Sequence, residues 1–286
     1  MNIQMNPSNT IPRSVDFGQS DYVLATGDRA VRRLQLLHNI YAPAGKRALL
    51  KAGLRPGMRV ADFGCGIGAT TRLLAEMVGE EGRITGIDLH EAQLVQAGNL
   101  CTQAGHRNVS LCRANASDTS LPDNMFDVVY CRFLLIHLPD PAACLQEMRR
   151  VLKPGGLIFV EDGDLSTAGS IPPSPLDETG RLFTQLGPRK GVDYLLGRNL
   201  YHMVKSAGFD EVEIEIHQPA IPRGENRALL KWSVEEAGRG FIDAGLLTPD
   251  QLDRLLHGMQ SAMDNPEILI LMPRMSLVWA RKGHAQ

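Results

Sequence analysis

Short apolar runs alternate with amphipathic stretches through the middle of this chain of 286 residues. The apolar runs have the length of buried strands and cover residues 58–63, 83–87, 109–112, 126–130 and 157–160. Apolar residues recur at helical spacing over residues 69–77, 91–104 and 141–152. Strands and helices in this alternation predict right-handed βαβ crossovers. The expected fold class is therefore α/β, a doubly wound, mostly parallel sheet of the Rossmann-like kind.

The first predicted strand runs directly into a glycine-rich loop, Gly64-Cys65-Gly66-Ile67-Gly68, and a helix follows it. Glycines permit a tight turn and a close approach of the backbone to a ligand. The free N–H groups at the start of the next helix point at whatever lies over the loop. Asp88 ends the next predicted strand, where an acid can accept hydrogen bonds from both ribose hydroxyls of a nucleoside. The combination predicts a site for a nucleoside-type cofactor.

The pattern divides the chain into three expected parts. Residues 1–45 would be an N-terminal leader with cap helices, one from Asp28 to Tyr41 and another opened by Pro43. Residues 46–162 would be the cofactor-binding core. Residues 163–286 would begin with an irregular stretch rich in Gly, Pro and Ser. Further sheet strands at 212–216 and 275–279 would follow, with a helical lid between them over 226–262.

Composition and charge remove several classes of protein. Lys and Arg total 30 and Asp and Glu total 32, a formal net charge of −2, so the basic signature of a nucleic-acid binder is missing. The longest apolar run, residues 268–272, is too short to cross a bilayer, which needs about 20 residues. The five cysteines show no CxxC pair and the histidines show no metal-ligand spacing. We therefore expect a cytoplasmic protein without a metal, a nucleic-acid partner or a membrane association.

Two cofactor classes fit the glycine loop. Read as Gly64-x-Gly66-x-x-Ala69, it satisfies the dinucleotide fingerprint, so an NAD(P)-dependent oxidoreductase is an alternative. Against that reading, Asp62 places an anion beside the position of a pyrophosphate, and the second half of the chain has no repeated mononucleotide-binding unit. Residues 115–116, after the third predicted strand, would instead contact an adenine edge.

Five segments together resemble the class I S-adenosylmethionine-dependent methyltransferases. They are residues 60–68, 86–88, 115–116, 126–132 and 150–156, in the family's order and at its spacings. The segment around Tyr22 and the Gly197-Arg198 stretch resemble a bacterial small-molecule branch of that family. The resemblance implies the cofactor S-adenosylmethionine, the product S-adenosylhomocysteine, and a small organic methyl acceptor. It covers roughly residues 50–162.

The resemblance also implies roles for residues of the glycine loop and the fourth strand. Gly64 and Gly66, with Cys65 between them, would pass under the methionine portion of the cofactor. The carbonyls of Gly64 and Cys131 would accept from its ammonium group. Asp62 would orient the loop or the ammonium through water. Arg132 lies in the same matching segment and is expected at the cofactor, with a substrate carboxylate or a simple ion pair as its other readings.

The adenosine portion is assigned in the same way. Asp88 would hold the ribose hydroxyls, and Leu89 would pack on the adenine. Asn115 and Ala116 would meet the adenine amino edge, although the family more often has Asp at the position of Asn115. Tyr22 would close over the cofactor from the N-terminal side.

The methyl acceptor has no motif of its own. Methyl transfer needs the acceptor aligned with the sulfonium methyl and, for an O–H or N–H acceptor, a base to take the proton. His137 and Glu161 follow strands at the predicted crevice and are the candidate catalytic residues, and His202 is a further candidate base. Each of the three also has a purely structural interpretation. His137 would be tied to the local backbone, Glu161 would anchor a loop, and His202 would be a buried core histidine.

The predicted lid and the missing acceptor leave two questions open. The apolar residues of the segment 219–270 would line an acceptor pocket, or equally pack on the core or on the partner of a homodimer. The expected activity is methyl transfer by in-line displacement. A cofactor-binding scaffold that transfers nothing is the alternative from another class of protein.

Overall fold

The computed structural model describes residues 28–283, and within them the main sheet has seven strands. Their spatial order is β3-β2-β1-β4-β5-β10-β7. The strands are β1 (Arg59–Phe63), β2 (Arg83–Asp88), β3 (Val109–Arg113), β4 (Phe126–Arg132), β5 (Leu152–Asp164), β7 (Asp210–His217) and β10 (Arg274–Arg281). The first five pair in parallel, and β10 is antiparallel to both of its neighbours. The predicted doubly wound, mostly parallel sheet is confirmed.

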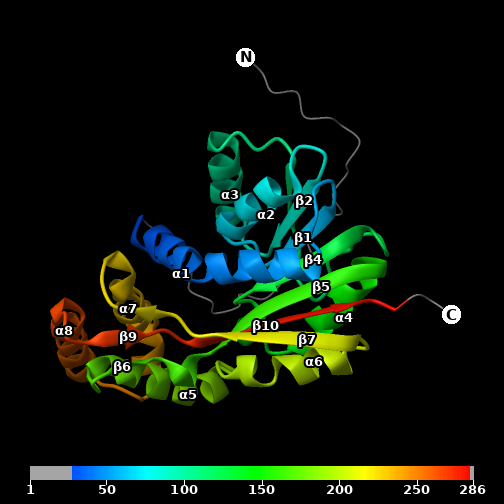
Figure 1. The fold of residues 1–286 in the computed structure, drawn as a ribbon. Coiled ribbons are helices and arrows are strands. Elements are labelled where there is room, and N and C mark those ends of the chain that lie inside the picture. Colours follow the sequence, from blue (N-terminus) through cyan, green and yellow to red (C-terminus); the bar gives the residue numbers. More distant parts are fainter. Residues whose placement is uncertain (1–27, 284–286) are drawn as a thin grey trace.

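Helices cover both faces of this sheet. Figure 1 shows α1, α2 and α3 on one side and α4 and α6 on the other. Their bounds are α1 (Asp28–Ala52), α2 (Ala69–Val78), α3 (Glu91–Gln103), α4 (Pro141–Val151) and α6 (Leu200–Ser206). The central strands are buried on both faces, as a parallel sheet requires; Val60, Val128, Ile158 and Val160 have no exposed surface.

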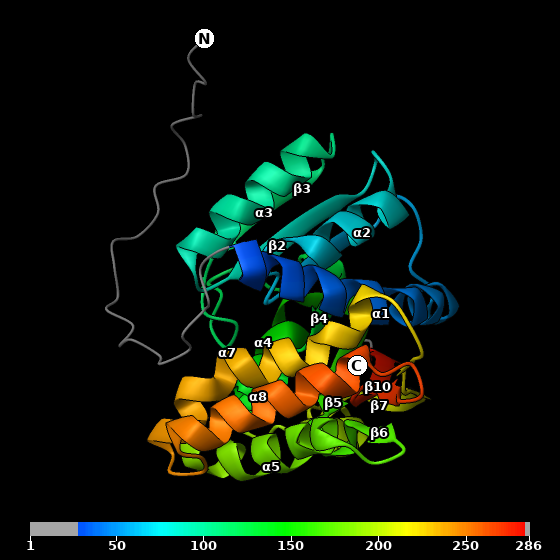
Figure 2. The ribbon, with the colours of Figure 1, turned by 90° about the vertical axis from the view of Figure 1, so that its left-hand side faces the viewer.

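A second layer of structure stands beside the carboxyl edge of the sheet. It consists of α5 (Glu178–Lys190), α7 (Leu229–Asp243), α8 (Pro249–Asp264) and a small antiparallel sheet of β6 (Gly169–Ile171), β9 (Leu269–Leu271) and β8 (Ala220–Ile221). Figure 2 shows α7 between α1 and the pair of α8 and α5. The helices α7 and α8 lie between β7 and β10 in the chain, so the predicted helical insertion between two sheet strands is confirmed.

Three details differ from the sequence-based expectation. The break at Pro43 was wrong, because α1 continues through it from Asp28 to Ala52. The stretch expected to be irregular contains the helix α5. The predicted boundaries at 45/46 and 162/163 fall inside α1 and β5, so neither separates two structural units.

The strand order places the ligand crevice. The chain winds from β1 outward to β3, then returns to β4 on the other side of β1. Ligands bind at such a switch point, beyond the carboxyl ends of the strands. Phe63 at the end of β1 pairs in register with Cys131 near the end of β4, so the glycine loop and the segment after β4 leave the sheet side by side. In residues 28–283 no helix has the length and apolar character needed to cross a membrane.

Gly68, which caps the start of α2, gives a first prediction. Its φ is +79°, and a Cβ there would lie 2.9 Å from Cβ and 3.2 Å from Cα of Ala97 in α3. We expect Gly68→Ala to lower the free energy of unfolding by about 1–3 kcal/mol, through the positive φ and the contact with α3.

Gly105 supplies the matched control for this prediction. Its φ is +80°, but a Cβ there would meet nothing within 4 Å. Gly105→Ala should therefore lower the free energy of unfolding only through the positive φ, by about 1 kcal/mol. Denaturant unfolding of the two variants measures the difference, and equal losses would show that α3 does not restrict the loop.

Candidate active site

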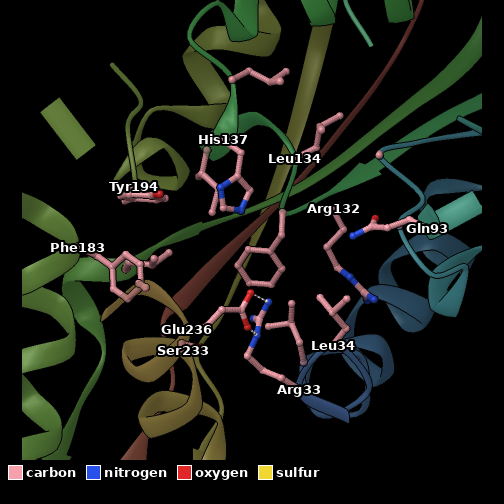
Figure 3. Close-up of a pocket in the computed structure, with 18 of the residues that line it drawn as sticks. Arg33, Leu34, Gln93, Arg132, Leu134, His137, Phe183, Tyr194, Ser233 and Glu236 are labelled. Atoms are coloured by element: carbon pink, nitrogen blue, oxygen red, sulfur yellow. Dashed lines mark hydrogen bonds and ion pairs between the residues drawn. The ribbon is translucent and has the colours of Figure 1, made fainter. Parts of the chain in front are cut away.

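A single cavity of about 850 Å³ extends from the glycine loop to α5 and α7. Its wall includes residues at the carboxyl ends of β1, β2, β3 and β4 and residues of α1, α5 and α7. In Figure 3, Arg132, Gln93 and Leu34 lie on one side of the cavity, and His137, Tyr194 and Phe183 lie on the other. We call these the cofactor end and the acceptor end.

The glycine loop forms the floor of the cofactor end. Gly64 and Gly66, with φ values of +68° and +54°, line the cavity with Cys65 between them. A Cβ on Gly64 would lie 2.8 Å from Cδ1 of Leu134, so this position admits only glycine without a shift of its neighbour. Burial raises the pKa of the Cys65 thiol far above its ordinary value, so Cys65 is a packing residue and not a nucleophile.

Asp88 links the end of β2 to the glycine loop. One carboxylate oxygen accepts from the backbone N–H of Gly66 at 2.9 Å, and the other accepts from the N–H of His90 at 2.9 Å. The side chain is half-buried and lines the cavity. Because each carboxylate oxygen has two lone pairs, Asp88 retains acceptor capacity toward the cavity.

Leu89, Asn115 and Ala116 line the cavity near Asp88, where the resemblance expected them. The amide oxygen of Asn115 accepts from the N–H of Ser117 at 2.9 Å, which holds the segment after β3 in a turn. The turn does not need the carboxylate that the family more often carries, because the amide oxygen of Asn115 closes it.

Arg132 at the end of β4 is held by neutral partners. Its Nη2 lies 2.9 Å from Nδ1 of His38 and donates to Oγ1 of Thr70 at 2.6 Å. Burial and the charge of Arg132 lower the pKa of His38 to about 4, which makes its Nδ1 an acceptor at neutral pH. No carboxylate oxygen in the described part of the chain lies within 4 Å of this guanidinium, so the simple ion pair predicted as one reading does not form. Its charge faces a cavity that can receive an anion.

His137 stands at the acceptor end, at the close of a short 3₁₀ turn, Leu135–His137. Its ring packs edge-on against Tyr194 with centroids 5.8 Å apart. The buried carboxylate of Asp162 accepts from the N–H of Ile136 at 3.2 Å and fixes the turn. Burial, with the charges of Arg33 and Lys190, lowers the pKa of His137 to about 4, so the imidazole is neutral at pH 7.

Several predicted site residues lie outside the cavity wall. Asp62 is buried beneath the loop, where its Oδ2 accepts from Oγ1 of Thr71 at 2.7 Å, and burial raises its pKa to about 7. The Cys131 side chain has no exposed surface. His202 on α6 is also absent from the wall, and Tyr22 lies outside the described residues. Asp62 thus bonds to α2, the helix that follows the glycine loop, and its orienting role stays a prediction.

Glu161 is the candidate base that the structure does not bring to His137. Its carboxyl is 1% exposed and accepts from the hydroxyl of Tyr130 at 2.6 Å. A Cβ on Gly45 would lie 2.5 Å from Oε1 of Glu161, so α1 covers this acid closely. Burial raises the pKa of Glu161. The physical reason for the displacement is that β5 continues to Asp164, three residues past Glu161, which leaves this acid inside the sheet.

Sequence reasoning missed the residues that α1 and α5 contribute. His38 lies in a predicted amphipathic helix and has no metal-ligand spacing, and Thr179 and Phe183 lie in a stretch expected to be irregular. The apolar spacing of Phe183, Leu186 and Leu182 was the available signal for α5.

Comparisons with known proteins agree with this geometry. Residues 61–160 match the family model described as "Methyltransferase domain". Demethylmenaquinone methyltransferase from Staphylococcus aureus (strain MRSA252) is 41% identical over 113 residues, which is 40% of this chain and 46% of that protein. The chain thus spans about half the length of the relatives it matches.

Solved structures resemble a larger share of the chain. The YcgJ protein from Bacillus subtilis has a TM-score of 0.58 at 16% identity, covering 85% of this chain and 100% of that one. A SAM-dependent methyltransferase from Aquifex aeolicus has a TM-score of 0.50 at 24% identity, covering 66% of this chain and 90% of that one. These likenesses show the fold.

The family model over residues 61–160, the fold and the glycine loop support a class I S-adenosylmethionine-dependent methyltransferase domain in this part of the chain. The resemblance inferred from the sequence is therefore confirmed, and S-adenosylmethionine is the cofactor of this class.

Proposed function

We propose that this protein transfers a methyl group from S-adenosylmethionine to a small organic acceptor by in-line displacement. The observation that carries the proposal is the single cavity, which joins Asp88 and Asn115 at one end to His137 and Tyr194 at the other. A continuous cavity allows a cofactor and an acceptor to meet end to end, as methyl transfer requires. The family match at residues 61–160 supports the same reaction.

The residues of the cofactor end fit the cofactor. Asp88 would accept from the two ribose hydroxyls while it keeps its bonds to the backbone of Gly66 and His90. Leu89, Asn115 and Ala116 would contact the adenine. The glycine loop and the Cys131 carbonyl would hold the methionine portion. Arg132, which has no carboxylate partner in the described chain, would meet the cofactor carboxylate.

The protein's own chemistry is positioning and proton removal. When bound, the cofactor supplies an electrophilic methyl group on a sulfonium centre. The acceptor end holds the acceptor against that methyl group, and the neutral imidazole of His137 takes the proton that an O–H or N–H acceptor loses. Glu161, buried under α1 and absent from the cavity wall, is assigned a positioning role through Tyr130 in β4.

Two measurements test the proposed function. Calorimetric titration should show binding of S-adenosylhomocysteine and none of NADH; binding of NADH alone would favour the oxidoreductase. Incubation of cell extract with methyl-labelled S-adenosylmethionine should then label a small-molecule fraction. Tight cofactor binding without any labelled product across extracts would favour a non-catalytic scaffold.

The setting of the reaction is part of the proposal. Five free cysteines among the described residues fit a reducing, cytoplasmic environment. The near-zero net charge favours a small-molecule acceptor over nucleic acid or a membrane surface. A homodimer is the expected assembly, which light scattering of the purified protein would test.

A further inference from the structure

One face of α5 forms a graded wall of the acceptor end. Thr179, Phe183, Leu186 and Lys190 all line the cavity, at successive spacings of four, three and four residues. Residues at these spacings share one helix face, and the stripe rises about 16 Å along the axis. Its chemistry changes from a hydroxyl through apolar side chains to a cation. A wall of this kind can bind different parts of an elongated molecule at different positions along its length.

The hydroxyl at the first position has no partner in the described part of the chain. Thr179 is 2% exposed, and its Oγ1 is buried without a hydrogen bond. A buried hydroxyl left unpaired is unfavourable by about 1–3 kcal/mol, and a ligand group that pairs with it would remove that cost. Thr184, five residues further along α5, shows the usual arrangement, because its Oγ1 donates to the Gly180 carbonyl at 2.7 Å.

The middle of the wall is aromatic and apolar. The Phe183 ring packs edge-on against Tyr194 at 5.2 Å and against Phe241 at 5.4 Å between centroids. Leu229 and Leu230 of α7 complete the lining. Figure 3 shows Phe183 and Tyr194 close together on the side of the cavity where His137 lies. This part of the cavity suits the apolar body of a ligand.

The far end of the wall carries unbalanced positive charge. Arg33 pairs with Glu236 and Arg239 pairs with Asp243, so these cavity-lining cations are neutralised. Arg189 and Lys190 also line the cavity, but no carboxylate of the described chain lies within 4 Å of either.

Lys190 turns toward the cavity and not away from it. A Cβ built on Gly240, in the α7 wall, would lie 3.5 Å from Lys190 Nζ. His137 lines the same cavity, so the two residues face one chamber. The helix C-terminus accounts for a general preference for cations here, but it does not require them to face a cavity.

We propose that the methyl acceptor is an elongated apolar organic acid, with its anionic group at Arg189 and Lys190 and a hydrogen-bonding group at Thr179. This inference rests on the proposed function, since it names the substrate class of the same cavity. The apolar body lies along Phe183 and Leu186.

Two probes that share one ring system test the proposal. The protein is first saturated with S-adenosylhomocysteine, and 6-hydroxy-2-naphthoate and 2-naphthol are then titrated by calorimetry. We expect the acid to bind at least tenfold more tightly. Equal affinities, or no binding of the acid, would overturn the proposal. Absence of S-adenosylhomocysteine binding would instead refute the proposed function, so the two failures are distinct.

Variants on α5 assign the preference to named residues. The double variant Arg189→Gln, Lys190→Gln should bring the affinity of the acid down to that of 2-naphthol, with S-adenosylhomocysteine binding unchanged. Arg181→Gln is the matched control, because Arg181 lies on the same helix but pairs with Glu178 outside the cavity. A preference that survives the double variant, or that is lost equally in the control, would contradict the assignment.

Thr179 gives a second readout that a structural role would not produce. Thr179→Val removes the unpaired hydroxyl, so the midpoint of thermal unfolding should stay the same or rise while the naphthoate binds several-fold more weakly. Thr184→Val removes a satisfied hydroxyl and should lower the midpoint without changing naphthoate affinity. Unchanged naphthoate affinity in Thr179→Val would remove Thr179 from the site.

Discussion

Replacing Asp88 with Ala should weaken the binding of S-adenosylhomocysteine by about 10- to 100-fold, which is about 1.4–2.8 kcal/mol. Two effects contribute. The ribose hydroxyls lose their acceptor, and the backbone N–H groups of Gly66 and His90 lose the carboxylate that anchors them. Hydrogen bonds to a charged group are stronger than bonds between neutral groups. Among single substitutions at the cofactor end, we therefore expect Asp88→Ala to cause one of the largest losses of affinity.

Two further variants separate these effects. Asp88→Asn keeps an oxygen for one of the bonds and should bind with intermediate affinity. Asp118→Ala changes an acid that follows β3 and lies outside the cavity wall, so it should bind as the unaltered protein does. Calorimetric titration gives the affinities, and thermal unfolding without ligand reports any loosening of the loop. Unaltered affinity in a folded Asp88→Ala variant would refute the placement of the ribose.

The cofactor end was predictable because its determinants are local in sequence. A buried strand, a loop of glycines and an acid at the end of the next strand are all visible as spacing, and the topology then brings Gly64, Asp88 and Asn115 to one edge. Except for β5, which extends well beyond its apolar run at 157–160, the strands of the main sheet were found to within one or two residues at each end, because buried parallel strands are short apolar runs between turn residues.

The helix α5 was missed for a reason that the structure explains. Gly180, Gly187 and Pro188 lower its intrinsic helix propensity. The glycines are there because a Cβ would lie 2.8 Å from the Ser166 carbonyl oxygen at Gly180, and 2.8 Å from the Val192 carbonyl oxygen at Gly187. Close packing therefore selected residues that indicate a loop when the sequence is read alone.

The continuity of α1 through Pro43 has the same origin. A proline inside a helix is unfavourable by about 3 kcal/mol, because it removes a hydrogen bond and crowds the preceding turn. Ile40, Tyr41, Ala42 and Ala44, which flank it, are buried against the sheet and its neighbours. Burial of these apolar side chains outweighs the local cost of the proline. The spacing of apolar residues in the sequence does not show which of the two effects is larger.

The acceptor end could not be read from the sequence, since it exists only where three distant helices meet. His137 could be predicted because it follows a strand. His38 and Thr179 could not, because only the folded chain shows that they line the cavity. Glu161 illustrates the opposite error. Its position at the end of the predicted strand suggested the crevice, but β5 is longer than its apolar run.

His137→Gln should lower kcat/KM for the acceptor labelled in extract by about 10²- to 10⁴-fold, the range over which a positioned base contributes. Affinity for S-adenosylhomocysteine should not change, because His137 lines the acceptor end, whereas Asp88 and Asn115 line the cofactor end. Steady-state kinetics and calorimetry on one preparation measure both quantities. A rate that is unaltered would show that the acceptor needs no base at this position.

The pH profile distinguishes a base from a packing residue. The pKa of His137 in the free protein is lowered to about 4, so the imidazole is neutral above that pH and protonated below it. For the unaltered protein, kcat/KM should therefore rise with pH through about 4 and be level near pH 7, and His137→Gln should remove that limb. His202→Gln, on α6 and outside the cavity, is the matched control and should keep both the rate and the limb. Glu161→Gln should also keep this rise in kcat/KM near pH 4, since Glu161 lies under α1. If Glu161→Gln removed the rise, Glu161 would be the base and His137 a packing residue.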